Sequence, residues 1–433
     1  MTGRRKGPRA IVVIGPVLMI FLAVTVEAQL PNPSAAALGM GENHVADAWG
    51  YSAVSTNPAG LAAPGKPASS FALMSLRGVG GLGPVGLAEI AEFDNGSVPD
   101  LVRRRWLDWI ISEGTEHGSA GAEVTFLAAH LGRFGVQLST TGHVVGEVGP
   151  GAAEIILFGN AGLTGEPADY AVTGGGLDVA VASTLALGYG HPIVLNEDRA
   201  ISVGATLGFT VGHLMVTAED AGSMLESDPL AISIDFPIAQ TDTLPSLARL
   251  NQGTGLGLHL GGLWHEGPLR LAVSVRNVFN TFAWDEGTMF YRPGQAVLTQ
   301  GEGSTDFDPQ SFAAAPPRLK ERVRDLRYAP VWSAGAAYDL RPDLALTSEI
   351  RGRIGDGQPI DGSFHAGAGV QYRPLEWLPL RAGAAVISEG FLVSGGLGLR
   401  LGVVRLDGAI AARRDEFGTG TLAMFTFSSE SAN

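Results

Sequence analysis

The chain has 433 residues, among them 61 glycines and 25 prolines, and only 17% of its residues are charged. This composition disfavours ordinary helical or α/β domains and favours an extended, turn-rich fold. The formal net charge of −14 excludes a general role in nucleic-acid binding, because phosphate contacts need clustered lysine and arginine. The chain contains no cysteine, so disulfides and lipid attachment through a cysteine are excluded as well.

The first 28 residues have the features of a secretory signal. Basic residues between Arg4 and Arg9 precede an apolar segment, 11–26, and a cleavage site of small residues ends at Ala28. The apolar segment is shorter than the ~20 residues that a membrane helix needs. We therefore interpret residues 1–28 as a cleaved signal peptide, with an uncleaved anchor helix as the alternative, and expect an exported protein.

Beyond the signal, nearly every segment alternates apolar and polar residues with a period of two, which is typical of β-strands. The pattern predicts fourteen strands, an even number as bacterial outer-membrane barrels have. They are expected near 68–78, 120–131, 133–145, 174–189, 200–214, 254–265, 268–280, 331–340, 343–353, 363–373, 379–388, 391–401, 403–413 and 418–428.

The connections between these strands alternate between short and long, which is the signature of short periplasmic turns and long outer loops. Short connections fall at 131–132, 191–199, 265–267, 341–342, 374–378 and 402, and long ones at 79–119, 146–173, 215–253 and 281–330. More modest outer connections fall at 354–362 and 414–417, and 389–390 is an exception that is short although it lies on the outer side. A soluble β-sandwich or solenoid shares the period-two pattern and is the architectural alternative. We expect a transmembrane barrel with both termini on the periplasmic side.

Charged residues on the predicted strands indicate which face points inward. An arginine or lysine facing lipid at mid-depth costs about 2–4 kcal/mol, so these side chains are expected to line the lumen. The expected lumen-lining residues are Arg270, Arg276, Glu349, Arg351, Arg381, Arg405 and Asp407. Pairing across strands is the more frequent role for such residues, and contact with a ligand is the alternative.

The long loops contain further predicted elements. A helix is expected at 98–111, where Trp106, Trp109 and Ile110 share one face, and we interpret these three side chains as an outer apolar ligand site. Other expected loop elements are strand-like segments at 231–238 and 289–298 and a solvated helix at 318–327, for which anion binding is the alternative role. An acidic turn at 356–361 is either a polar turn or a calcium site.

No catalytic motif occurs in the chain, and we predict no enzyme activity, no metal and no cofactor. The glycine-rich segment 255–261 lacks the spacing of a dinucleotide-binding loop and suits close strand packing instead. His259 and His265 lie an even number of residues apart on one strand, but a metal site needs further ligands.

The stretch 35–62 contains the most distinctive motif. Pro58 fixes its own φ angle and moves Asn57 out of the helical region, so a short helix is expected to end in a tight turn there. Together, Leu38-Gly39-Met40-Gly41 and Asn57-Pro58-Ala59-Gly60-Leu61-Ala62 resemble the N-terminal hatch of the FadL-like outer-membrane proteins. That superfamily includes transporters of hydrophobic compounds and the PorV component of type IX secretion. The segment 42–44, Glu-Asn-His, departs from the usual hatch.

The resemblance implies a barrel of about fourteen strands in the outer membrane. Residues 29–66 would form a plug inside it, with Asn57, Pro58 and Ala59 as the hatch turn, and 67–433 would form the barrel and its extracellular loops. It also implies a monomer that passively transports small, fatty-acid-like hydrophobic molecules. The alternatives are a PorV-like protein that holds secreted proteins at the cell surface and a purely structural barrel. The expected partners are outer-membrane lipid and either a hydrophobic small molecule or a secreted protein.

Overall fold

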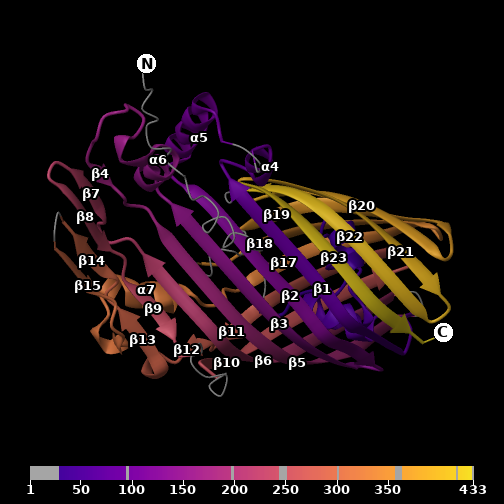
Figure 1. Cartoon of the computed structure of the whole chain (residues 1–433). Coiled ribbons are helices and arrows are strands. Elements are labelled where there is room, and N and C mark those ends of the chain that lie inside the picture. The colour runs from indigo at the N-terminus through magenta and orange to yellow at the C-terminus, as the bar shows by residue number, and fades with distance from the viewer. Residues whose placement is uncertain are drawn as a thin grey trace.

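The computed structural model describes residues 29–93, 97–196, 199–242, 251–299, 302–355, 363–415 and 418–431. Within these ranges fourteen antiparallel strands pair in sequence, and β1 pairs with β23, so the sheet closes into a barrel (Figure 1). The barrel strands are β1 (Ser69–Gly83), β2 (Glu116–Leu131), β3 (Phe134–Val148), β5 (Gly176–Asn196), β6 (Arg199–Glu219), β10 (Gly253–Glu266), β11 (Leu269–Asn280), β17 (Val331–Arg341), β18 (Leu344–Arg353), β19 (Phe364–Leu375), β20 (Leu378–Ile387), β21 (Gly390–Leu401), β22 (Val404–Asp415) and β23 (Gly418–Glu430).

The predicted fourteen-stranded barrel is confirmed, and each predicted strand overlaps one observed strand. The prediction of a short loop at 191–199 was wrong, because β5 continues to Asn196 and pairs with β6 over most of that stretch. The sequence pattern did not indicate this continuation of β5, because a proline such as Pro192 inside an apolar run usually ends a strand. The two strands are each 21 residues long, which makes them the longest strands of the barrel.

The side chains of each barrel strand alternate between a buried inner face and an exposed outer face. On β11, Arg270 and Ser274 are 6% and 3% exposed, whereas Leu271 and Val273 between them are 43% and 59% exposed. Exposed apolar side chains on every second position suit lipid and not water. The closed barrel, its even strand number and its apolar exterior place the chain in the outer membrane and exclude the soluble alternatives.

The long connections gather at one end of the barrel, and most of the short turns lie at the other end (Figure 1). The two-residue turn between β20 and β21 is an exception, because it lies at the end of the long loops. In outer-membrane barrels the short turns face the periplasm. The outer loops include a second sheet of five strands in the order β15 (Gly303–Asp306), β14 (Gln295–Leu298), β8 (Leu230–Asp235), β7 (Met224–Ser227) and β4 (Tyr170–Ala171). The expected strand-like segments at 231–238 and 289–298 are parts of these loops.

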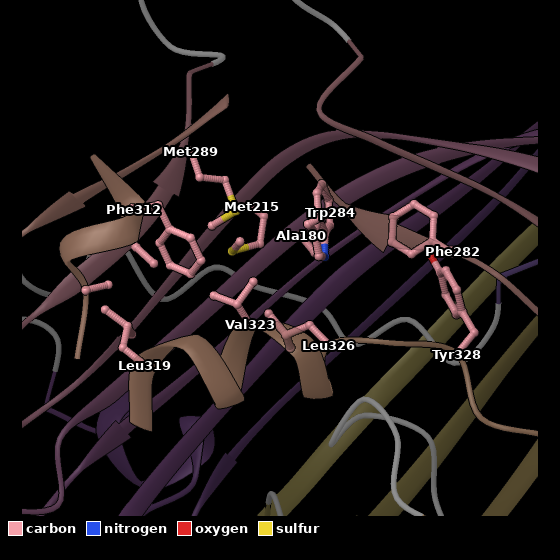
Figure 2. Close-up of a cluster of buried hydrophobic side chains, with 12 residues drawn as sticks. Ala180, Met215, Phe282, Trp284, Met289, Phe312, Leu319, Val323, Leu326 and Tyr328 are labelled. Atoms are coloured by element: carbon pink, nitrogen blue, oxygen red, sulfur yellow. The ribbon is translucent and has the colours of Figure 1, made fainter. Parts of the chain in front are cut away.

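Two further strands of the outer loops, β9 (Ile238–Thr241) and β13 (Met289–Arg292), extend the sheet beside β6. Helix α7 (Pro317–Asp325) covers them, because Leu319 and Val323 insert into an apolar cluster with Met215 of β6 and Phe312 (Figure 2). The helix expected at 318–327 therefore exists, but it is amphipathic and not only solvated. The expected acidic turn at 356–361 and the signal peptide lie outside the described residues.

Three helices form a separate cap over the outer end of the barrel: α4 (Leu87–Ala91), α5 (Asp100–Glu113) and α6 (Pro150–Phe158). The predicted helix at 98–111 corresponds to α5. Among the described residues, no helix is both long and apolar enough to cross a membrane.

The N-terminal residues 29–62 lie inside the barrel, and we call residues 29–66 the plug segment. It contains α2 (Ala35–Gly39), the 3₁₀ turns η1 (Gly50–Ser52) and η2 (Pro58–Ala62), and the single-turn helix α3 (Ala53–Thr56). Helix α2 contacts β20 to β23, η1 contacts β1 to β3, and η2 contacts β5, β6 and β10, so the wall surrounds it.

Candidate functional site

The turn at Asn57 joins the plug segment to the wall. Helix α3 ends there because Asn57 adopts an extended conformation before Pro58. The Asn57 amide nitrogen donates to the backbone oxygens of Val45 at 3.2 Å and of Gly262 on β10 at 3.3 Å, and its Oδ1 accepts from the Ala59 backbone N–H at 3.2 Å. Asn57 is completely buried. One side chain thus links two parts of the plug segment to each other and to β10.

Wall glycines let the plug segment approach the strands closely. A Cβ atom added at Gly204 on β6 would lie 2.3 Å from the Pro58 carbonyl carbon, and one at Gly383 on β20 would lie 2.1 Å from that of Met40. No real side chain tolerates such distances to a backbone atom, so only glycine fits at these two positions. The period-two pattern of the sequence does not reveal which glycines have this role.

Glu349 on β18 holds the opposite side of the plug segment. Its carboxylate accepts hydrogen bonds from the backbone N–H groups of His44 and Val45, each at 2.9 Å. The carboxylate side chain is 4% exposed. A buried charge that accepts two backbone hydrogen bonds is a strong anchor, because both donors would otherwise be unsatisfied away from water. Burial also lowers the pKa of the His44 imidazole below its ordinary value.

Glu42 of the plug segment forms ion pairs with arginines on two strands that are not neighbours in the barrel, β1 and β18. Its carboxylate lies 2.5 Å from Arg77 on β1 and 3.4 Å from Arg351 on β18. Glu42 has a φ of 63°, a left-handed conformation that costs energy for a residue other than glycine. Arg77 also approaches Glu123 on β2 at 3.3 Å. The residues that depart from the usual hatch sequence therefore make the central contacts of this lumen.

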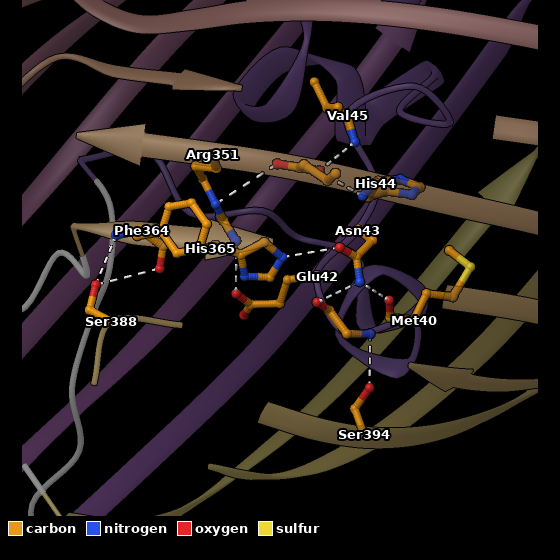
Figure 3. A network of polar contacts seen from close by, with 12 residues as sticks. Met40, Glu42, Asn43, His44, Val45, Arg351, Phe364, His365, Ser388 and Ser394 are labelled. Carbon is orange, nitrogen blue, oxygen red and sulfur yellow. Dashed lines mark hydrogen bonds and ion pairs between the residues drawn. The ribbon is translucent and has the colours of Figure 1, made fainter. Parts of the chain in front are cut away.

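The neighbouring Asn43 continues this network (Figure 3). Its amide nitrogen donates to the Met40 and Gly41 backbone oxygens, and its Oδ1 lies 3.1 Å from the His365 imidazole on β19. The Gly41 N–H donates to the Ser394 hydroxyl on β21 at 2.8 Å. Four successive residues, 41–44, therefore contact strands β1, β18, β19 and β21 together.

Two cavities lie on either side of the plug segment, and the seven expected lumen residues divide between them. Arg276, Glu349 and Arg351 line a cavity of ≈50 Å³ on the outer side. A cavity of ≈370 Å³ on the periplasmic side is lined by the other four, which are Arg270, Arg381, Arg405 and Asp407. Most of them form ion pairs across strands, such as Arg270 with Asp339 and Arg381 with Asp407, each at 2.6 Å.

The sequence interpretation missed several charged residues of the lumen. Glu42, Arg77 and Glu123 form the ion cluster described above, and Arg373 and Arg400 line the periplasmic cavity. The inward parity of β1 would have identified Arg77. Among the residues that the structure describes, no group of three or more histidine, aspartate or glutamate side chains is placed to hold a metal ion.

The three side chains expected to form an outer apolar site belong to the core of the helical cap. Trp106 and Ile110 are 6% and 4% exposed and pack with Leu107 of the same helix and Ala153 of α6. Trp109 lies at the edge of this core, with the Arg105 guanidinium 5.3 Å from its ring centre. Trp106 and Ile110 are therefore buried in the core of the cap, and only Trp109 of the three lies at the edge of that core.

A third, apolar hollow of ≈510 Å³ lies on the wall near the periplasmic ends of β2, β3, β5 and β6, and includes Phe134, Leu187 and Leu207. Behind this hollow the wall has no inward-facing side chains at two positions, because Gly135 and Gly188 stand there. A Cβ atom added at Gly135 or Gly188 would lie 2.9 or 2.8 Å from the Leu61 side chain of the plug segment. Leu61 inside and the hollow outside are thus separated by the main chain of two glycine positions.

The fold and this interior define a class of protein: an outer-membrane barrel whose lumen is occupied by its own N-terminal segment. Among solved structures, the chain is similar in fold to a Pseudomonas aeruginosa FadL homologue, with 11% identity and a TM-score of 0.47 over 94% of this chain and 99% of that chain. It is also similar to the Pseudomonas putida toluene transporter TodX, with 11% identity and a TM-score of 0.46 over 92% and 99% of the two chains.

A third similar structure is the CymD monoaromatic hydrocarbon channel, with 12% identity and a TM-score of 0.49 over 95% of this chain and 99% of that chain. No protein-family model and no curated protein matches the sequence.

Proposed function

We propose that the protein passes small hydrophobic molecules passively across the outer membrane, and that they leave the lumen sideways through the wall. The observation that carries this proposal is the thin wall at Gly135 and Gly188, with Leu61 of the plug segment on one side and the apolar hollow on the other. A straight axial path meets the plug segment, which contacts strands all around the barrel. An exit into lipid favours apolar cargo, because polar cargo loses its hydration there.

The plug segment supports a gated route. Its turn at Asn57 is held by two hydrogen bonds of 3.2 and 3.3 Å, to Val45 and to Gly262, which are long for N–H···O contacts. Movement of Asn57, Pro58 and Ala59 would move Leu61, which follows in the same 3₁₀ turn, away from the thin wall. Residues 29–66 thus act as the plug, and Trp109 at the margin of the cap is the first apolar contact that we assign to incoming cargo.

Uptake measurements in cells that produce the protein in the outer membrane test this function. The probes are radiolabelled toluene and a radiolabelled long-chain fatty acid, compared with cells that carry an empty vector. Uptake of either probe above the empty-vector rate supports the proposal and distinguishes hydrocarbon from fatty-acid cargo. Uptake at the empty-vector rate for both, with the barrel present in the membrane, contradicts it.

A second candidate function is a PorV-like one, in which the outer loops hold a secreted protein. One face of the five-stranded outer sheet presents apolar side chains to solvent, and exposed patches of this kind often bind partners. They are Leu230, Ile232, Ile234 and Leu298, which are 36–47% exposed. Extraction in mild detergent followed by mass spectrometry tests this candidate: a stoichiometric secreted protein favours it, and a stoichiometric apolar small molecule favours transport.

A further inference from the structure

The periplasmic cavity beneath the plug segment is strongly cationic, although the whole chain is acidic. Its ≈370 Å³ are lined by the plug segment and by strands between β11 and β23, next to the short turns. The lining includes seven lysine or arginine side chains and four aspartate or glutamate side chains. The formal net charge of the chain is −14, so this excess of positive charge is local.

Some of these cations are neutralised by acidic neighbours. Arg381 lies 2.6 Å from Asp407 and also donates from Nε to the Gln371 side chain at 2.8 Å. Arg405 forms an ion pair with Glu430 of β23. These contacts account for the acidic residues on this side of the cavity.

Three cations face the same cavity and form no ion pair of 4.0 Å or less within the described part of the chain: Lys66, Arg373 and Arg400. Glu430 attracts Arg400 and Lys66 from a greater distance, but it is already paired with Arg405. Arg400 is half-buried, and its Nε atom is buried without a hydrogen-bond acceptor in that part of the chain. Arg373 donates one guanidinium hydrogen bond to the backbone oxygen of Pro342. The Lys66 ammonium lies 5.0 Å from the centre of the Trp49 ring.

Positive charges that converge on one enclosed space repel each other, and the repulsion grows where water is partly excluded. An anion placed between them removes that repulsion and gains charge-assisted hydrogen bonds. Guanidinium groups suit carboxylate and phosphate oxygens in particular, because their planar fork matches two oxygens at once. The chemistry of this cavity is therefore that of an oxyanion site.

We propose that the cavity binds a small organic oxyanion, a carboxylate or a phosphate ester, with Arg400 as its main contact and Arg373 and Lys66 as supporting ones. A water molecule occupies about 30 Å³ in the liquid, so the cavity holds a body several times larger than one oxyanion group. Met40 and Trp49 on the plug segment supply apolar and aromatic surface for that body. This site does not depend on the proposed hydrophobic passage, because it lies at another wall of the lumen.

Isothermal titration calorimetry on the purified full-length barrel in non-ionic detergent tests the proposal. Sodium benzoate probes a carboxylate with an aromatic body, and inorganic phosphate probes the bare oxyanion. We expect saturable binding of at least one probe, weaker at higher salt because the contacts are electrostatic. Arg400→Gln is expected to weaken binding at least tenfold, and Arg373→Gln several-fold.

Arg133→Gln is the matched control, because Arg133 is an exposed arginine in the periplasmic turn between β2 and β3 and does not line the cavity. Loss of benzoate binding in Arg400→Gln supports a carboxylate site, and loss of phosphate binding supports a phosphate site. Lys66→Gln serves as the second variant if Arg400→Gln does not assemble, because Lys66 lies at the end of the plug segment. The proposal is overturned if neither probe binds the native protein, or if all three cavity variants bind the probe as tightly as the native protein does.

Discussion

The plug segment meets the two sides of the barrel in different ways. On the side of β3, β5 and β6 the contacts are apolar or neutral: Val54 and Leu61 pack with Leu30 and Ala186, and the Thr206 hydroxyl donates to the Val54 backbone oxygen. On the side of β18 to β22 they include a buried charge, because the Glu349 carboxylate accepts hydrogen bonds from the plug segment there, beside apolar contacts such as Leu38 with Leu392. Apolar contacts respond little to pH and salt, whereas a buried charge depends on every one of its partners. The charged side is therefore the side at which single changes release the segment.

The largest effect is expected from Glu349→Ala on the charged side. The change leaves the buried N–H groups of His44 and Val45 without an acceptor, and breaking a buried charged contact typically costs about 3–5 kcal/mol. We expect the plug segment to loosen and the ionic conductance of the barrel in planar lipid bilayers to rise. Glu113→Ala, at the exposed end of α5, is the control. Native conductance in Glu349→Ala would show that the charged side does not hold the segment.

A smaller effect is expected from Gly204→Val on the apolar side. The new Cβ would lie 2.3 Å from the Pro58 carbonyl carbon, so the segment must shift, and overpacking of this kind costs about 1–3 kcal/mol. Thermal unfolding of the detergent-solubilised barrel measures the loss. Gly408→Val has open space around its Cβ position and is expected to unfold like the native protein. Equal unfolding temperatures for the two variants would contradict the close contact at Gly204.

Asn57→Ala should have a still smaller effect on stability and a larger one on gating. The variant loses hydrogen bonds to Val45 and Gly262 and the cap on the following turn, a loss of about 1–2 kcal/mol. Backbone amides of 58–62 are expected to exchange faster with deuterium than in the native protein. Unchanged exchange throughout this turn would mean that Asn57 does not anchor it.

The smallest expected effect is a dependence of the barrel's ionic conductance on pH. His44 is buried and its pKa in the folded state is lowered, so it stays neutral inside the barrel. The unfolded chain binds a proton on this residue below about pH 6.5, and the folded state then loses stability relative to it. We expect conductance to rise as the pH falls from 7 to 5, and His44→Asn to reduce this rise. If the conductance of His44→Asn rises by the same amount, titratable groups other than His44 cause the pH dependence.

Much of the barrel could be predicted from the sequence, because one side of each strand faces lipid and the other faces the polar lumen. The alternation of Arg270, Leu271, Ala272 and Val273 locates one strand and its inner face without further information. The strand ends were harder to predict, as β5 shows, because nothing in a period-two pattern marks where a strand leaves the membrane. The position of Asn57 was indicated by the proline that follows it.

The interior contacts could not be predicted in the same way, because they join residues that are hundreds of positions apart. Nothing near Glu42 in the sequence indicates that it pairs with Arg77 and Arg351. The apolar spacing of α5 correctly predicts a packed helix face, but spacing alone does not separate a face that packs in the cap core from one that binds ligand. Trp106→Ala is accordingly a probe of cap folding, and Trp109→Ala is the better probe of cargo contact.

The most direct test of the central claim compares uptake of an apolar probe by the double variant Gly135→Ala, Gly188→Ala with uptake by Gly408→Ala. The two added methyl groups lie between Leu61 and the outer hollow, whereas the one at Gly408 meets open space. If cargo leaves through the wall, uptake by the double variant falls by about tenfold, equivalent to about 1.4 kcal/mol in the barrier, and uptake by Gly408→Ala stays native. Native uptake by the double variant, with the barrel correctly assembled, would contradict a lateral exit at this wall.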